Sequence, residues 1–112
     1  MIKLKDILLE STAPDIFVPR RIEDRIERMI KTYIRNGSNG DLKLTGLDLT
    51  KLPDILKDIT VGENFGCSYN KLTSLDGAPK IVYNDFYCRN NNVQFTEAQV
   101  RAVCDVKGDV FV

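Results

Sequence analysis

The side chains of this chain that could do chemistry are mainly carboxylates and thiols, because the sequence contains no histidine. Asp41, Asn64, Asp85 and Asp109 recur at intervals of 21 to 24 residues. Oxygen atoms stacked at such a repeat could hold calcium or magnesium, which both prefer oxygen ligands. The alternative is that these side chains are solvated residues of turns. We favour the alternative and therefore predict no metal site and no cofactor.

The three cysteines, Cys67, Cys88 and Cys104, form no Cys-x-x-Cys pair that would suggest a zinc site. Their odd number is typical of a reducing compartment. We expect all three to be small buried hydrophobic residues; a disulfide between Cys67 and Cys88 is the alternative. Without histidine there is neither a Ser-His-Asp triad nor a Cys-His pair, and no glycine-rich phosphate loop is present. The sequence therefore predicts that the protein is not an enzyme.

Three segments of the chain align with one another and must position these side chains. Equivalent apolar residues lie 23 residues apart between Leu42 and Phe65 and 21 apart between Phe65 and Phe86, and a partial fourth copy starts at Val110. Such a period is typical of a solenoid, in which each repeat buries its apolar face against its neighbours. The copies run through Leu42, Leu44, Leu47, Leu49 and Leu52, then Phe65, Cys67, Asn70, Leu72 and Leu75, then Phe86, Cys88, Asn91, Val93 and Phe95.

Each copy starts with an alternation of apolar and polar residues, which predicts a short strand with one buried face. A third apolar position, Val61, Val82 and Val106, precedes each following strand by four residues. A helix is expected from Pro19 to Asn36, with one buried stripe, and a second over residues 97–105, where Thr96 and Gln99 form a capping box. The predicted stripe consists of Ile22, Ile26, Met29, Ile30, Tyr33 and Ile34, and the second helix should bury Val100, Val103 and Cys104.

We therefore predict an α+β fold: a short solenoid of parallel strands in three to four repeats, capped by an N-terminal amphipathic helix, with a short helix before the last strand. Within one domain, residues 1–13 form an amphipathic peptide, 14–39 the capping helix and 40–112 the solenoid. The last strand offers an exposed edge through which two copies could pair.

The 16 basic residues are balanced by 16 acidic ones, whereas nucleic-acid binders usually carry a basic excess. An Arg-rich face of the first helix (Arg20, Arg21, Arg25, Arg28, Lys31 and Arg35) leaves nucleic-acid binding open as an alternative. Interspersed acids favour a solvated helix face instead. No stretch has the roughly 20 apolar residues that would span a bilayer, so we expect no membrane partner.

The second copy, from Phe65 through Asn70 to Leu75, resembles the leucine-rich-repeat pattern L-x-L-x-x-N-x-L-x-x-L. That resemblance implies that Asn70 bonds main-chain groups, as Asn91 would in the third copy, and that the ladder is interrupted at Leu47. The phrases at residues 70–79, 84–88 and 95–108 resemble small leucine-rich-repeat proteins of tailed bacteriophages. The resemblance implies a phage origin and a location in the host cytoplasm, without implying an activity.

Residues 8–10, Leu-Leu-Glu, also resemble the site at which some phages cleave a packaging peptide, here after Glu10. This leaves a virion or head-internal protein as an alternative to an ordinary amphipathic end.

The surface along the strands is the main candidate site, because a solenoid usually functions through it. Aromatic residues and arginine often dominate the energetics of protein interfaces. We therefore expect a host or phage protein to bind the outward residues Lys43, Thr45, Ser68, Tyr87, Arg89 and Phe111.

Overall fold

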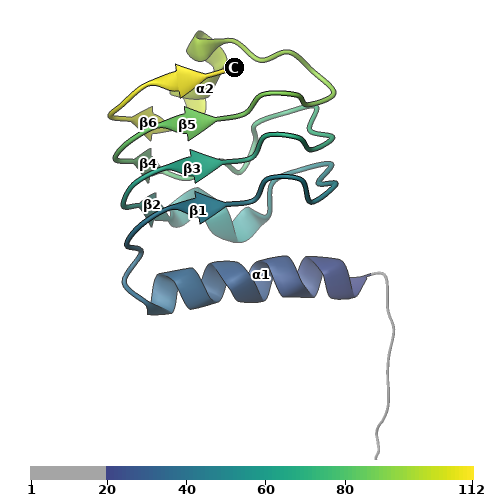
Figure 1. Ribbon diagram of the computed structural model, residues 1–112, viewed down its shortest axis with the longest axis vertical. Coiled ribbons are helices and arrows are strands. Elements are labelled where there is room, and N and C mark those ends of the chain that lie inside the picture. Colours follow the sequence, from purple (N-terminus) through teal and green to yellow (C-terminus); the bar gives the residue numbers. More distant parts are fainter. Residues whose placement is uncertain (1–19) are drawn as a thin grey trace, which may run out of the picture.

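The computed structural model describes residues 20–112, which form an α+β fold with two α-helices and parallel strands in two sheets (Figure 1). The predicted peptide 1–13 and the cleavage site at Glu10 lie outside the described residues. The helical elements are α1 (Arg20–Arg35), the 3-10 helix η1 (Asp54–Asp58) and α2 (Glu97–Val103). The strands are β1 (Leu42–Lys43), β2 (Thr60–Val61), β3 (Phe65–Gly66), β4 (Ile81–Val82), β5 (Phe86–Tyr87), β6 (Asp105–Val106) and β7 (Val110–Phe111).

The four-stranded sheet has the order β1-β3-β5-β7 and is parallel throughout. Leu42 is paired with Phe65, Phe65 with Phe86, and Phe86 with Val110, so the predicted alignment of the repeats is the register of the sheet. We call each strand of this sheet, together with the residues that follow it in its repeat, a rung. Paired residues of neighbouring strands therefore lie on successive rungs. After each repeat of 21 to 24 residues, the chain therefore reaches the equivalent position on the neighbouring strand.

A second, three-stranded parallel sheet has the order β2-β4-β6 and lies behind the first in Figure 1. It pairs Val61 with Val82 and Val82 with Val106, and all three side chains are buried. The sequence predicted these valines as a third core position but did not predict that they form a sheet. The chain thus alternates between the two sheets as it ascends the stack.

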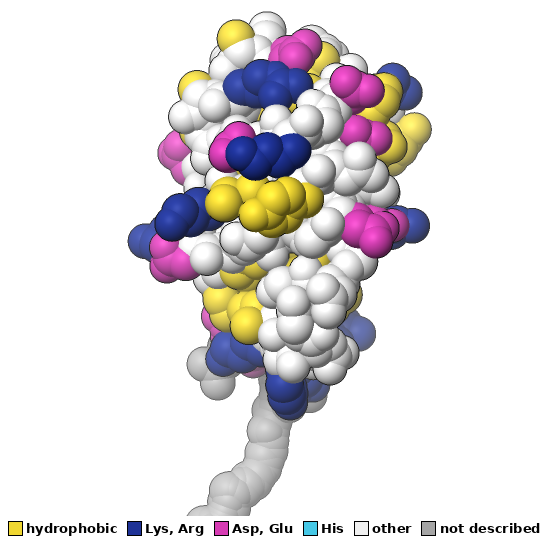
Figure 2. Space-filling model, turned by 90° about the vertical axis from the view of Figure 1, so that its left-hand side faces the viewer, with side chains coloured by type: hydrophobic (Ala, Val, Ile, Leu, Met, Phe, Trp, Pro, Cys, Tyr) yellow, Lys and Arg dark blue, Asp and Glu magenta, His cyan; other side chains and the backbone are white. Residues whose placement is uncertain are grey.

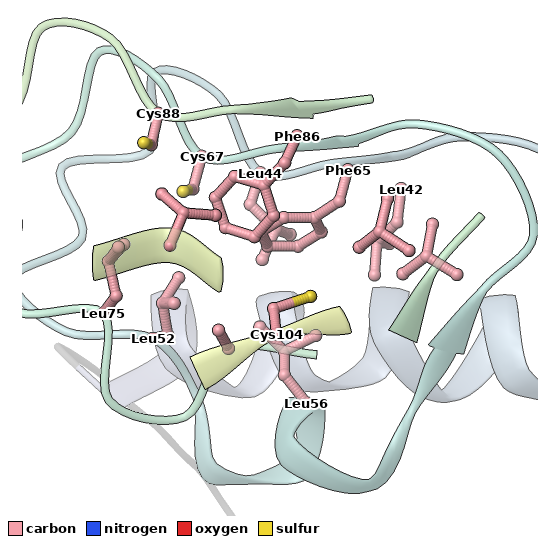
Figure 3. Packing of buried hydrophobic residues seen from close by; sticks show 14 of the residues in the cluster. Leu42, Leu44, Leu52, Leu56, Phe65, Cys67, Leu75, Phe86, Cys88 and Cys104 are labelled. Carbon is pink, nitrogen blue, oxygen red and sulfur yellow. The ribbon is translucent and has the colours of Figure 1, made fainter. Parts of the chain in front are cut away.

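The core lies between the two sheets and contains the apolar side chains of every rung (Figure 3). Phe65 and Phe86 are completely buried, with ring centroids 5.1 Å apart. Figure 3 shows both rings pointing from the four-stranded sheet into the interior, where Leu56 and Cys104 approach from the other side. Among the apolar positions of the three copies, Val93 was wrongly expected in the core: it is 38% exposed, whereas Phe95, two residues later, is buried.

Helix α1 covers the β1 end of the stack with a narrower apolar stripe than predicted. Ile26 and Ile30 are buried, but Met29 and Ile34 are 40% and 41% exposed, so burial of those two was wrongly expected. The cause is geometric, since one helix resting on the end of a thin stack contacts it along a single line of side chains. Tyr33 closes this junction: its single hydroxyl proton is shared between the carbonyl oxygens of Ser38 and Gly40, and its oxygen accepts from the amide of Gly62.

Helix α2 begins with the predicted capping box, in which Thr96 and Gln99 exchange side-chain and backbone hydrogen bonds. Val100 and Cys104 are buried as expected, whereas Val103 is 42% exposed because the helix ends there and turns directly into β6. In the part of the chain that the structure describes, no helix combines the length and the apolar character needed to cross a membrane.

Asparagine side chains join the rungs where the chain leaves the four-stranded sheet. The side-chain oxygen of Asn70 accepts from the amides of Leu47 and Leu49, and that of Asn91 accepts from the amide of Leu72. Asn70 therefore bonds main-chain groups as the repeat pattern implied. The first rung has Leu47 at this position, so its amides donate to the asparagine of the second rung but it has no such asparagine of its own.

Candidate functional site

The outer face of the four-stranded sheet is organised in columns, because side chains at equivalent positions of successive strands stack one above another. Lys43 is paired with Gly66, Gly66 with Tyr87, and Tyr87 with Phe111. We call these four residues the central column. Beside it, Thr45, Ser68 and Arg89 occupy the equivalent positions two residues further along each rung. The structure therefore brings all six predicted binding residues to one face.

The upper half of the central column is an aromatic stack. The rings of Tyr87 and Phe111 are nearly parallel, with an interplanar angle of 10° and centroids 4.8 Å apart. This separation equals the usual spacing of neighbouring strands, so the sheet itself sets the stacking distance. The guanidinium carbon of Arg89 lies 5.5 Å from the centroid of the Phe111 ring, within cation–π range. The three side chains form one ordered cluster at the surface.

Ser68 differs from the other predicted binding residues, because its side chain is buried and only 7% of the residue is exposed. The hydroxyl oxygen accepts a hydrogen bond from the amide of Arg89 at 3.0 Å, which ties the second rung to the third. Ser68 therefore supports the outer face from below, whereas Lys43, Thr45 and Arg89 are exposed.

The lower half of the central column contains a hollow with a volume of about 440 Å³. Gly66 is one of its lining residues and has no side chain to fill the second rung of the column. The lining residues are Asp41, Lys43, Thr45, Asn64, Gly66, Ser68 and Tyr87. Gly66, Asp41 and Asn64 were not among the predicted binding residues. A glycine at an outward strand position between Lys43 and Tyr87 was the available signal for the hollow.

The repeated Asp and Asn residues before the strands bond the backbone of the next rung. Asp41 accepts from the amide of Asn64, Asn64 from that of Asp85, and Asp85 from that of Asp109, at 2.9 to 3.0 Å. One acceptor oxygen of each side chain is thus used within the stack. Among the described residues, no group of three or more potential metal-ligating side chains comes together.

The three cysteines are buried in the core and each is a free thiol. Burial raises the pKa of Cys88 to about 11 and that of Cys104 to about 12. Burial also raises the pKa of Cys67, with a smaller contribution from the neighbouring thiols. Desolvation disfavours the thiolate, which is the nucleophilic form, so these side chains act as small apolar residues.

Charges of both signs are interspersed on the side of the molecule where the turns before β3, β5 and β7 lie (Figure 2). On α1, Lys31 is near Glu27 at 3.8 Å, one helical turn away. This arrangement weakens any extended positive field that phosphate binding would use.

The upper ends of the two sheets differ. At β6, the Arg101 guanidinium donates to the carbonyl oxygens of Val106 and Gly108 at 2.7 and 2.9 Å, and so covers the edge of the second sheet. Strand β7 forms one edge of the four-stranded sheet. Pairing of two copies through β7 stays a prediction.

Comparisons with protein-family models, with curated proteins and with solved structures give no match for this chain.

Proposed function

We propose that this protein is a binding module of the leucine-rich-repeat type that recognises a protein partner through the outer face of the four-stranded sheet. The repeat spacing, the parallel register and the asparagines that bond main-chain groups between rungs all support a repeat solenoid. The likeness of residues 70–79 and 84–88 to phage proteins supports a partner from a phage or its bacterial host.

The observation that carries the proposal is the cluster of Tyr87, Phe111 and Arg89 on the outer face. Aromatic and arginine side chains provide most of the binding free energy in many protein interfaces, particularly when they are ordered before binding. The two rings are held parallel by the register of β5 and β7, so a partner would not need to order them. The cluster has no role in the core, which lies on the opposite face of the same strands.

The chemistry of the remaining candidates supports binding over catalysis. The thiols are buried and protonated at neutral pH, and the repeated carboxylates accept backbone hydrogen bonds. The outer face instead combines an aromatic stack, two exposed cations at Lys43 and Arg89, and a hollow lined by Lys43 and Tyr87. These are features of a recognition surface.

Quantitative affinity purification from infected bacterial cells would test the proposal, with the wild-type chain and the variants Tyr87→Ala and Arg89→Ala as bait. We expect a partner that the wild type captures to be lost by at least tenfold with Tyr87→Ala. Arg89→Ala should lose it by a similar or smaller factor, because the guanidinium contacts only Phe111 within the cluster.

Tyr83→Ala is the matched control, since Tyr83 is 54% exposed and lies next to β4 of the other sheet. This variant should capture the same partner as the wild type. Circular dichroism must show that all variants are folded. Capture of one partner at equal levels by the wild type, Tyr87→Ala and Arg89→Ala would remove the outer face as its binding site.

A further inference from the structure

We infer that the hollow over Gly66 is a slot for one aromatic side chain of the partner protein, which would continue the ring stack of Tyr87 and Phe111. This inference rests on the proposed function, because it names the group that the outer face recognises. It concerns the lower half of the central column, where the stack of side chains is interrupted.

The interruption follows from the register. Three of the four positions in the central column carry long side chains, and only the second rung has a glycine. The distance from the rung of Tyr87 to the rung of Lys43 is two strand spacings, or about 9.6 Å. Aromatic rings stack with centroids about 4.5–7 Å apart. One ring at the level of Gly66 would therefore stand at stacking distance from Tyr87.

The walls of the slot are suited to a planar group. Tyr87 lines the hollow but Phe111 does not, so one face of the Tyr87 ring is stacked on Phe111 while its other side borders the hollow. Lys43 lies across the hollow and offers an aliphatic stem and an ammonium group, which favour contact with an aromatic face. Gly66 and Ser68 form a floor that is buried between these walls.

The rim of the slot is polar, which favours an aromatic side chain with a hydrogen-bonding edge. Thr45, Asn64 and Asp41 also line the hollow and contribute polar side chains to it. The Ser68 hydroxyl oxygen accepts from the Arg89 amide, and the hydroxyl can still donate its own proton. Tryptophan and tyrosine combine a stacking face with such an edge and are common anchors at protein interfaces. A tryptophan or tyrosine of the partner fits this site best.

Titration of the 15N-labelled wild-type chain with N-acetyl-tryptophanamide, followed by NMR, tests the slot directly. We expect saturable shifts of the amides of Lys43, Thr45, Gly66 and Tyr87, with a Kd on the order of 1–10 mM for so small a probe. N-acetyl-leucinamide should shift them by less than a third as much. Absence of saturable shifts, or equal shifts with the leucine probe, would overturn the inference.

Gly66→Thr is the variant that fills the slot from below. A Cβ at Gly66 would lie 3.2 Å from Oγ1 of Thr45, whose exposed side chain can move aside, and threonine suits a strand position. We expect this variant to fold and to lose at least fivefold in affinity for the tryptophan probe. If the folded variant binds the tryptophan probe as tightly as the wild type, the inference is overturned. If the variant does not fold, the titration of the wild type decides.

The same variants separate this inference from the proposed function. If Tyr87→Ala loses the captured partner while Gly66→Thr keeps it at full affinity, the outer face binds the partner but the slot does not receive its side chain. A short oligothymidylate that shifts the same four amides at a lower concentration than the tryptophan probe would also overturn the inference. In that case the slot would receive a nucleobase.

Discussion

The side-chain amide of Asn70 donates to the carbonyl oxygen of Leu44, which lies 26 residues earlier in the chain, at 2.7 Å. The same amide group is also within hydrogen-bonding distance of the carbonyl oxygens of Cys67 and Ser68. With the two amides that its oxygen binds, this one buried side chain bonds the first rung to the second. The outer face depends on this bond pattern, because it fixes how the rungs are stacked.

We predict that Asn70→Ala lowers the free energy of unfolding by about 2–4 kcal/mol, because it leaves several backbone groups without partners and each such buried group costs about 1–3 kcal/mol. Urea denaturation measures the effect. Asn92→Ala changes an exposed asparagine and should alter stability by less than about 0.5 kcal/mol. Equal stability of the two variants would show that the Asn70 bonds contribute nothing.

Gly108 lies in the turn before β7, where the backbone of the previous rung is very close. An added Cβ would lie 2.5 Å from the carbonyl oxygen of Asn84, closer than real contacts allow. We therefore predict that Gly108→Ala destabilises the protein by about 1–3 kcal/mol, as overpacking does. Gly66→Ala is the control, since its Cβ would meet only a mobile hydroxyl at 3.2 Å. Thermal denaturation should give a clearly lower Tm for Gly108→Ala than for Gly66→Ala.

The Asp and Asn residues before the strands differ in charge but accept equivalent hydrogen bonds. Asp85→Asn should therefore change the free energy of unfolding by less than about 0.5 kcal/mol, because Asn64 already provides an amide oxygen at this position. Asp85→Ala should cost about 1 kcal/mol through the lost bond to the Asp109 amide. A rise in Tm of the wild type on addition of calcium, absent in Asp85→Asn, would contradict a purely structural role.

The buried thiols predict a pH dependence of stability. Their pKa values in the folded state are raised above the ordinary value of 9.0, to about 11 for Cys88 and about 12 for Cys104. The unfolded chain therefore loses these protons first, so the stabilisation is complete below about pH 9 and declines as the pH rises towards the folded-state values. Urea denaturation at pH 8 and pH 10 measures this decline.

A Cys88→Ala/Cys104→Ala double variant is the control for the pH effect. It should be less stable at pH 8, because it leaves small cavities, but its stability should fall less steeply between pH 8 and pH 10 than that of the wild type. An identical decline in both proteins would show that other groups cause it.

The sequence period predicted which residues pair on neighbouring strands. Leu42, Phe65 and Phe86 are all buried, and a shift of one residue in the register would turn one of them out of the core. The second sheet was not predicted, since one valine in each copy has no alternating neighbours to indicate a strand. Met29 and Ile34 were wrongly expected to be buried, because a helical stripe shows which face is apolar but does not show how much of that face the rest of the protein covers.

The candidate site was predicted in part. Alternation along each strand identified the outward residues, but it does not reveal that Ser68 is buried and bonded to the Arg89 amide of the next rung. The stacking of Tyr87 on Phe111 requires the register of β5 and β7, which are separated by the whole of α2 and β6. The hollow likewise depends on the absence of a side chain at Gly66 between two long ones.

Site-specific photo-crosslinking to the captured partner tests most directly whether the outer face binds protein. A photoreactive benzophenone side chain placed at Thr45, on the exposed part of the outer face, should crosslink to the partner. The same group at Lys57, an exposed residue of η1 outside that sheet, should not. Efficient crosslinking from position 57 with none from position 45 would contradict the account and place the binding surface elsewhere on the molecule.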